Sequence, residues 1–222
     1  MKRSLKEQDA GPIRLRAANV IQDAILAGEF SAGQEIPQLP LSQRLGLSQS
    51  SVREALLELE YRGFIRKSGR NWKLTELSED ELADLYQVRL LLEPEACRLA
   101  AAHWTAAPRE ELESALRRMA KAASRNNYRE HWAADIDFHA VIWRAQPNRS
   151  LEKQLVNVCM PIFAHGVLST QAVSPESYRR SVAWHGLIAK LLEARNGERA
   201  AQVARKVIPR FHRLNLADFW RK

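Results

Sequence analysis

The pattern of hydrophobic and polar positions changes near residue 77, which divides the chain into two parts. In the first part the apolar positions form short segments at helical or strand spacing, separated by turns rich in Gly, Ser and Asn. These segments predict helices over 13–27, 41–45 and 49–62, a loop over 29–39, and strands over 64–67 and 72–75. Gly28 and Gly63 stand where two of the helices should end. Helix, tight turn, helix and hairpin together predict a winged helix-turn-helix over residues 1–76.

The second part, residues 77–222, carries long amphipathic helices throughout. Ser78 followed by acidic residues as far as Glu81 is typical of a helix start, because the hydroxyl can cap and the acids suit the helix dipole. The predicted helices run over roughly 79–103, 108–125, 128–146, 149–168, 176–195 and 198–219. Short loops between long helices favour antiparallel neighbours. The predicted fold is therefore mainly α: an N-terminal winged helix-turn-helix followed by a C-terminal antiparallel all-helical bundle.

Composition narrows the class of protein. With 222 residues, of which 45% are hydrophobic, the chain can bury a core, and no apolar run is long enough to span a bilayer. The charged N-terminus lacks the apolar stretch of a signal peptide, so we expect a cytoplasmic protein with no membrane partner. Cys97 and Cys159 are expected to be reduced packing residues. The net charge of +8 favours an anionic partner, although the excess is spread over both parts of the chain.

The second helix of the helix-turn-helix is suited to enter the major groove of DNA with its first residues at base edges. A Gln there can pair with adenine, an Arg with guanine or phosphate, and small hydroxylated side chains allow close approach. The candidate DNA contacts are Arg44, Ser48, Gln49, Ser50, Ser51, Arg53, Gly69 and Arg70. An ordinary helical hairpin with exposed polar residues would show the same pattern, so the pattern alone leaves that alternative open.

Several runs in this region closely resemble the N-terminal domain of GntR-family regulators. They are Ala27-Gly28-Glu29-Phe30, Gly33-Gln34, Leu45-Gly46-Leu47-Ser48, Val52-Arg53-Glu54-Ala55-Leu56, Leu59-Glu60 and Gly63-Phe64-Ile65. The sequence departs from the family pattern at Gln49, where Arg is usual, at Leu39, near which a basic residue is common, and at Ser51, where Pro is common. The resemblance implies a homodimer that binds a palindromic operator in double-stranded DNA and responds to a small organic acid or similar metabolite.

The C-terminal part contains a cluster that could bind a metal. Asp135 and His139 are four residues apart, so they project from the same helix face, which points at least partly inward. His185 lies on the inward stripe of another predicted helix. A carboxylate with imidazoles suits a divalent Zn, Ni or Mn ion. The alternative is a buried Asp–His hydrogen bond without metal, in a pocket that binds its ligand directly.

The same part resembles the FCD ligand-sensing domain of the FadR branch, in the run from Leu77 to Leu82 and in Arg89-x-x-x-Glu93-x-x-Ala96. The resemblance implies a metal set of Asp135, His139, His185 and a fourth His, whose place is taken by Val207; His212, five residues later, should face elsewhere. Arg89 could pair with an anionic effector or with Glu93 one turn away. The candidate effector residues are Arg89, Asp135, His139 and His185, whereas His103, His131 and His165 are expected to be surface or satisfied histidines.

These features predict a sequence-specific DNA-binding transcription regulator whose operator affinity is modulated by a small metabolite, expected to be a carboxylate, in the C-terminal domain. One alternative is a metal-dependent hydrolase that uses Asp135, His139 and His185. The sequence shows no His-Glu-x-x-His, Gly-x-Ser-x-Gly or P-loop signature and no obvious general base beside these residues, so an enzyme is not expected. A second alternative is an architectural DNA-binding protein without effector. The sign of regulation stays open.

Overall fold

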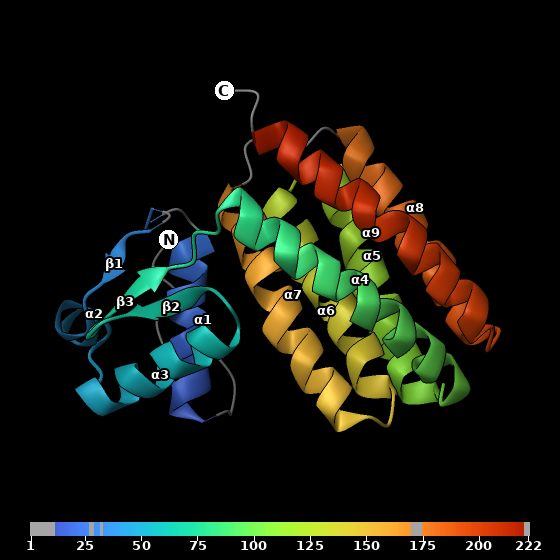
Figure 1. Ribbon diagram of the computed structural model, residues 1–222. Helices are drawn as coiled ribbons and strands as arrows, with labels where there is room; N and C mark the ends of the chain where they lie inside the picture. Colours follow the sequence, from blue (N-terminus) through green and yellow to red (C-terminus); the bar gives the residue numbers. More distant parts are fainter. Residues whose placement is uncertain (1–11, 27–28, 32, 170–174, 220–222) are drawn as a thin grey trace. The chain divides into compact units, whose positions relative to one another are not determined.

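The computed structural model describes residues 12–26, 29–31, 33–169 and 175–219, with side-chain detail for all of these except Leu26, Ser169 and 211–219. The chain divides between Leu77 and Ser78 into two compact units (Figure 1). The first is a winged helix-turn-helix and the second a helical bundle, so the predicted fold class is confirmed. Among the described residues, no helix is long and apolar enough to cross a membrane.

The N-terminal unit combines helices with a small antiparallel sheet. Its elements are α1 (Ile13–Leu26), β1 (Glu35–Ile36), α2 (Gln38–Leu45), α3 (Gln49–Tyr61), β2 (Ile65–Ser68) and β3 (Asn71–Leu74). The strands pair in the order β1-β3-β2. Helix α1 packs against α3, and α2 and β2 also contact α3. Val52, Leu56 and Leu59 of α3 are fully buried, as the helical spacing predicted.

Local hydrogen bonds set the tight turn between α2 and α3. Gly46 ends α2 with a φ of 65°, a left-handed conformation that glycine adopts without strain. Ser48 then caps α3, because its hydroxyl accepts the Ser51 N–H over 3.1 Å. Gly63, with a φ of 73°, follows the last turn of α3 where the sequence predicted that the helix ends.

Two helices begin two or three residues earlier than predicted, and each has a proline in its first turn. Helix α2 starts at Gln38 rather than residue 41, and α5 starts at Ala106 rather than residue 108. Pro40 and Pro108 each lie in the first turn, where backbone N–H groups have no partner within the helix, so the missing N–H of proline costs little. The predicted loop over 29–39 also contains β1, whose two residues are too few to give a periodic signal.

In the wing, which is the hairpin of β2 and β3, both strands are shifted by one residue toward the turn relative to the prediction. Ser68 pairs with Asn71, which leaves Gly69 and Arg70 as a two-residue turn. Within this turn only Gly69 adopts a positive φ, 63°. Asn71 is instead the first residue of β3, and its Nδ2 donates to Glu35 Oε2 over 3.0 Å. The asparagine therefore stabilises the sheet next to the turn.

The C-terminal unit consists of α4 (Glu79–Ala102), α5 (Ala106–Ser124), α6 (Tyr128–Ala145), α7 (Arg149–Ser169), α8 (Pro175–Glu193) and α9 (Gly197–Phe219). Figure 1 shows them as a bundle of long helices. Helix α4 packs against α6, α7, α8 and α9, which makes it the central helix of the bundle. It begins with the predicted capping box, in which Ser78 Oγ accepts the Glu81 N–H and Glu81 Oε2 accepts the Ser78 N–H.

Two of the residues named from the sequence lie where the structure gives no detail. Gly28 and the side chain of His212 lie outside the described residues, although residue 212 is part of α9. Cys97 and Cys159 are free and buried, as predicted, and burial raises the pKa of both thiols.

Candidate functional site

The structure places most of the candidate DNA contacts on exposed surface of the N-terminal unit. Ser48, Gln49, Ser50 and Arg53 are exposed at the start of α3, and Ser51 beside them is half-buried. Ser48 Oγ lies 2.9 Å from both Ser50 Oγ and Ser51 Oγ, so the hydroxyl groups bond to one another. Gly69 and Arg70 are exposed in the wing turn. Their accessibility is what contact with DNA requires.

The three arginines among these candidates differ in whether they already form an ion pair. Arg44 of α2 pairs with Glu29, and each side chain of that pair is about half exposed, at 50% and 47%. Arg53 and Arg70 have no ion pair within the part of the chain that the structure describes. A phosphate would have to compete with Glu29 for Arg44, whereas Arg53 and Arg70 are available.

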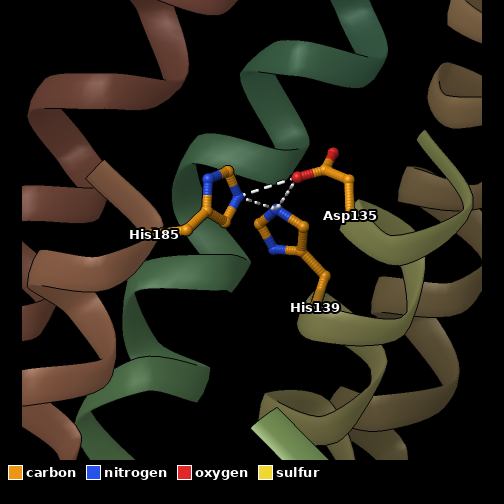
Figure 2. A group of neighbouring side chains, drawn as sticks. All are labelled: Asp135, His139 and His185. Atoms are coloured by element: carbon orange, nitrogen blue, oxygen red, sulfur yellow. Dashed lines mark hydrogen bonds and ion pairs between the residues drawn. The ribbon is translucent and has the colours of Figure 1, made fainter. Parts of the chain in front are cut away.

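The candidate metal residues come together in the C-terminal unit, from two helices. Asp135 and His139 are on α6 and His185 is on α8, and Figure 2 shows the three side chains converging. His185 Nε2 lies 2.8 Å from Asp135 Oδ1 and 3.3 Å from His139 Nε2, and His139 Nε2 lies 3.8 Å from Asp135 Oδ1. All three residues are buried. Sequence spacing predicted the Asp135–His139 pair, and the packing of α8 on the bundle brings in His185.

Neighbouring groups orient both imidazole rings toward the cluster. The Nδ1 atom of His185 donates to the Ser181 carbonyl oxygen over 2.7 Å. The Nδ1 atom of His139 contacts the Glu93 carboxylate of α4. Because a carbonyl and an ionised carboxylate only accept, each Nδ1 carries a proton and each Nε2 faces the cluster. This carboxylate or carbonyl support of the second ring nitrogen is typical of histidines that bind metals.

A buried oxygen of the cluster lacks a proper donor. Asp135 Oδ1 is close to both Nε2 atoms, yet no N–H in the described residues points at it with hydrogen-bond geometry. An unsatisfied buried carboxylate oxygen is costly, and it is rare in folded proteins. A divalent cation bonded to this oxygen and to the two Nε2 atoms would satisfy it. The donor set and its orientation therefore fit a divalent metal such as Zn, Ni or Mn.

The charged groups of the cluster stabilise one another. Burial alone would raise the pKa of Asp135, but its interactions with His185 and His139 hold the pKa well below the ordinary value. Burial opposes a charge on His185, but the Asp135 carboxylate raises its pKa above the ordinary value. Burial likewise opposes ionisation of Glu93, but the guanidinium of Arg89 and the imidazole of His139 keep its pKa low. Without metal, the cluster is therefore a network of opposite charges.

The cluster forms one side of a cavity in the C-terminal unit. The cavity has about 80 Å³ in which the centre of a water molecule can lie, several times the roughly 10–15 Å³ that a single water needs. Much of the remaining lining is apolar or aromatic and includes Trp132, Phe163, Trp184, Ile188, Val207 and Ile208. Val207 lies in the wall, so the position that the resemblance predicted for a fourth ligand offers no donor atom.

Arg89 also lines the cavity, and it is already paired. Its Nε donates to Glu93 Oε2 over 2.5 Å, and its Nη2 lies 3.3 Å from His139 Nε2. The sequence left open whether Arg89 pairs with an effector or with Glu93, and the structure shows the pair with Glu93. An anionic effector would have to share the guanidinium with that carboxylate.

Sequence reasoning missed the roles of two polar residues near the cluster, Glu93 and Ser181, whereas His131 is satisfied as predicted. Glu93 was considered only as a partner of Arg89, whereas it also contacts His139 and accepts from Trp143 Nε1 over 3.3 Å. Ser181, which orients His185, was not identified, although it stands one helical turn before that residue. His131 is buried and satisfied, with Nε2 3.2 Å from Ser181 Oγ. His103 is exposed and His165 is buried.

Comparison with known proteins identifies both units. Residues 14–74 match the family described as bacterial regulatory proteins, gntR family. Residues 84–209, more than half of the chain, match the FCD domain. The first match covers the helix-turn-helix and wing, and the second covers the cavity and its cluster.

Individual relatives are consistent with these two domain matches. The chain is 34% identical over 161 residues to the Glc operon transcriptional activator of Escherichia coli, with 63% of each chain covered. It is 29% identical over 153 residues to the E. coli HTH-type transcriptional regulator YieP, covering 59% of this chain and 66% of that protein. The chain thus spans slightly less than two thirds of these relatives. The solved structure of E. coli McbR/YncC has the same fold, with a TM-score of 0.78, 18% identity, and coverage of 95% of this chain and 100% of that one. The chain therefore belongs to the GntR family and carries a C-terminal FCD domain.

Proposed function

We propose that this protein is a DNA-binding transcriptional regulator. It binds a palindromic operator as a homodimer, and a small carboxylate bound in the C-terminal cavity sets its operator affinity. The observation that carries the proposal is the buried cluster of Asp135, His139 and His185 beside a cavity in the FCD domain. Such a cluster presents coordinating and hydrogen-bonding atoms to a ligand that enters the cavity. A bundle that served only for dimerisation would be expected to fill this space with apolar side chains.

The proposed effector is a small acid. The cavity volume of about 80 Å³ is below the roughly 150 Å³ of an engineered protein cavity that holds benzene, which favours a short aliphatic body over an aromatic one. A divalent ion held by Asp135, His139 and His185 would supply a positive anchor for the carboxylate, since these three leave coordination positions open. Arg89 orients the acid from α4 through its partly shared guanidinium.

The proposed coupling runs through α4, α6 and α8. The ligand-facing groups come from these helices, so a bound acid favours the arrangement of the bundle in which all of them reach it. In the dimer that arrangement selects the half-site spacings that the two DNA-binding units can match. The Escherichia coli relative is named an activator of the Glc operon. The same coupling can serve activation or repression, depending on where the operator lies.

The test compares operator binding with and without acid. An operator is first selected from random duplexes, and its affinity is then measured by fluorescence anisotropy against a series of short aliphatic carboxylates, with one equivalent of Zn²⁺. We expect one or more acids to change the operator Kd by roughly 5- to 150-fold, the usual range of allosteric coupling. An unchanged Kd at saturation with every acid of the series would refute the proposal.

Two variants of α6 localise the effect. Asp135→Asn removes the central carboxylate charge and should abolish both stoichiometric Zn²⁺ binding and the response to acid. Asp137→Asn is the matched control, because Asp137 is exposed on the same helix and pairs with Arg118 instead. The control should bind Zn²⁺ and respond like the original chain. A normal response in Asp135→Asn would show that the effector binds elsewhere.

A further inference from the structure

Gln49 presents an uncommitted amide at the start of α3. It is the first residue of the helix, its side chain is exposed, and the amide has no hydrogen-bond partner within the described residues. Its backbone is fixed, because Gln38 Nε2 donates to the Gln49 carbonyl oxygen over 2.8 Å. An exposed polar side chain thus extends from a backbone position that is held in place at the start of α3.

The serine hydroxyls next to Gln49 already form local hydrogen bonds, and they discriminate poorly between bases. Ser48 Oγ accepts the Ser51 N–H over 3.1 Å and lies 2.9 Å from Ser50 Oγ, so these hydroxyls already bond locally. A hydroxyl also both donates and accepts, and it can therefore bond to any base. The Gln49 amide offers a fixed acceptor and a fixed donor side by side. It is the group of this turn best able to tell one base edge from another.

The donor and the acceptor of a side-chain amide match the hydrogen-bonding groups of one purine, adenine. In the major groove adenine presents the N7 acceptor beside the N6 donor, so an amide can form two hydrogen bonds with it. Guanine presents two acceptors, N7 and O6, so one amide bond is lost and the amide oxygen faces another oxygen. An arginine at the same position would show the opposite preference, because it only donates.

We propose that Gln49 reads the adenine of an A·T pair in each half of the operator. This inference rests on the proposed function, in which α3 enters the major groove. Arg53 supports it, since it lies one helical turn further on the same face, is exposed, and has no ion pair in the described part of the chain. It supplies the charge that attracts the helix to DNA, while Gln49 selects the base.

The experiment is a selection from random DNA duplexes with the full chain, followed by sequencing of the bound pool. The original chain should enrich an A·T pair at one position of each half-site, with roughly a 5- to 150-fold preference over G·C in competition binding. Gln49→Arg should change that position to G·C, and Gln49→Ala should make it degenerate. Both variants should keep their unfolding temperature, since the side chain is exposed and forms no hydrogen bond with any described residue.

A matched control separates base reading from added charge. Gln43→Arg adds the same charge on α2, at another exposed glutamine. It should tighten binding to all duplexes without changing the enriched sequence. If Gln49→Arg enriched the same sequence as the original chain, or if Gln43→Arg produced the same base change, the assignment would be wrong. If the original chain enriched no sequence at all, the proposed operator binding would fail first, and the assignment with it.

Discussion

The buried pair of Arg89 and Glu93 gives a strong prediction for stability. The two side chains are only 7% and 3% exposed, and their contact is 2.5 Å. Glu93→Gln keeps the shape of the side chain but removes its charge, so the Arg89 guanidinium would remain buried without its counter-ion. Breaking a buried pair on one side typically destabilises by about 3–5 kcal/mol. For a domain of this size that corresponds to a fall in Tm of roughly 6 to 20 °C.

The cause can be isolated by a double-mutant cycle in which Arg89→Met keeps much of the apolar stem and removes the cation. The double variant Arg89→Met/Glu93→Gln should lose less stability than the two single variants together, by about 2 kcal/mol. Unfolding by urea is followed by tryptophan fluorescence in the presence of a chelator, so that metal binding does not add to stability.

The adjacent pair of Glu95 and Arg98 is the internal control, because both side chains are about 40% exposed. Glu95→Gln should change the free energy of unfolding by at most about 1 kcal/mol, as exposed ion pairs do. If Glu93→Gln proved as mild as Glu95→Gln, or if the losses at Arg89 and Glu93 simply added, the charge network would not be what stabilises α4 in the bundle.

Three further predictions concern the metal cluster and the DNA-binding surface. Val207→His should supply the missing donor and raise Zn²⁺ affinity roughly tenfold or more in a chelator competition assay, whereas Ile208→His, on the next residue of the cavity wall, should not. In metal-free protein, the lowered pKa of Asp135 adds stability that is lost as pH falls below about 4, and the raised pKa of His185 adds stability that is lost as pH rises above about 6.5. Thermal unfolding should therefore show a decline from pH 6 to pH 9 that Asp135→Asn abolishes; an equal decline in both proteins would contradict the pairing. Arg53→Ala should abolish specific operator binding and leave folding intact, and footprinting retained by that variant would remove Arg53 from the interface.

The sequence predicted the fold well because most of its signals are local. Capping by Ser78, the αL glycine at Gly63 and the helical spacing of Val52 and Leu56 act within a few residues of chain. The errors arose where short-range signals are ambiguous. Pro40 marks either a break or a first helical turn, and a two-residue strand such as Glu35–Ile36 has no period to detect.

The candidate site was predictable only in part, because its completion depends on contacts between distant segments. Asp135 and His139 share a helix, so their spacing alone placed them together. The contact between Glu93 and His139 joins α4 to α6 across a large sequence separation, and no periodicity indicates which carboxylate will meet which imidazole. Spacing likewise could not show that Arg89 would be shared between Glu93 and the cavity.

The reciprocal bonds between Ser78 and Glu81 determine where the chain can be cut without damaging the bundle. Both groups lie on the C-terminal side of the division between the two units, so a fragment that begins at Leu77 keeps the whole cap. A fragment that begins at Asp80 loses the capping hydroxyl, at a cost of about 1 kcal/mol, and the first turn of its central helix would fray. The longer fragment is thus the better choice for isolating the FCD domain.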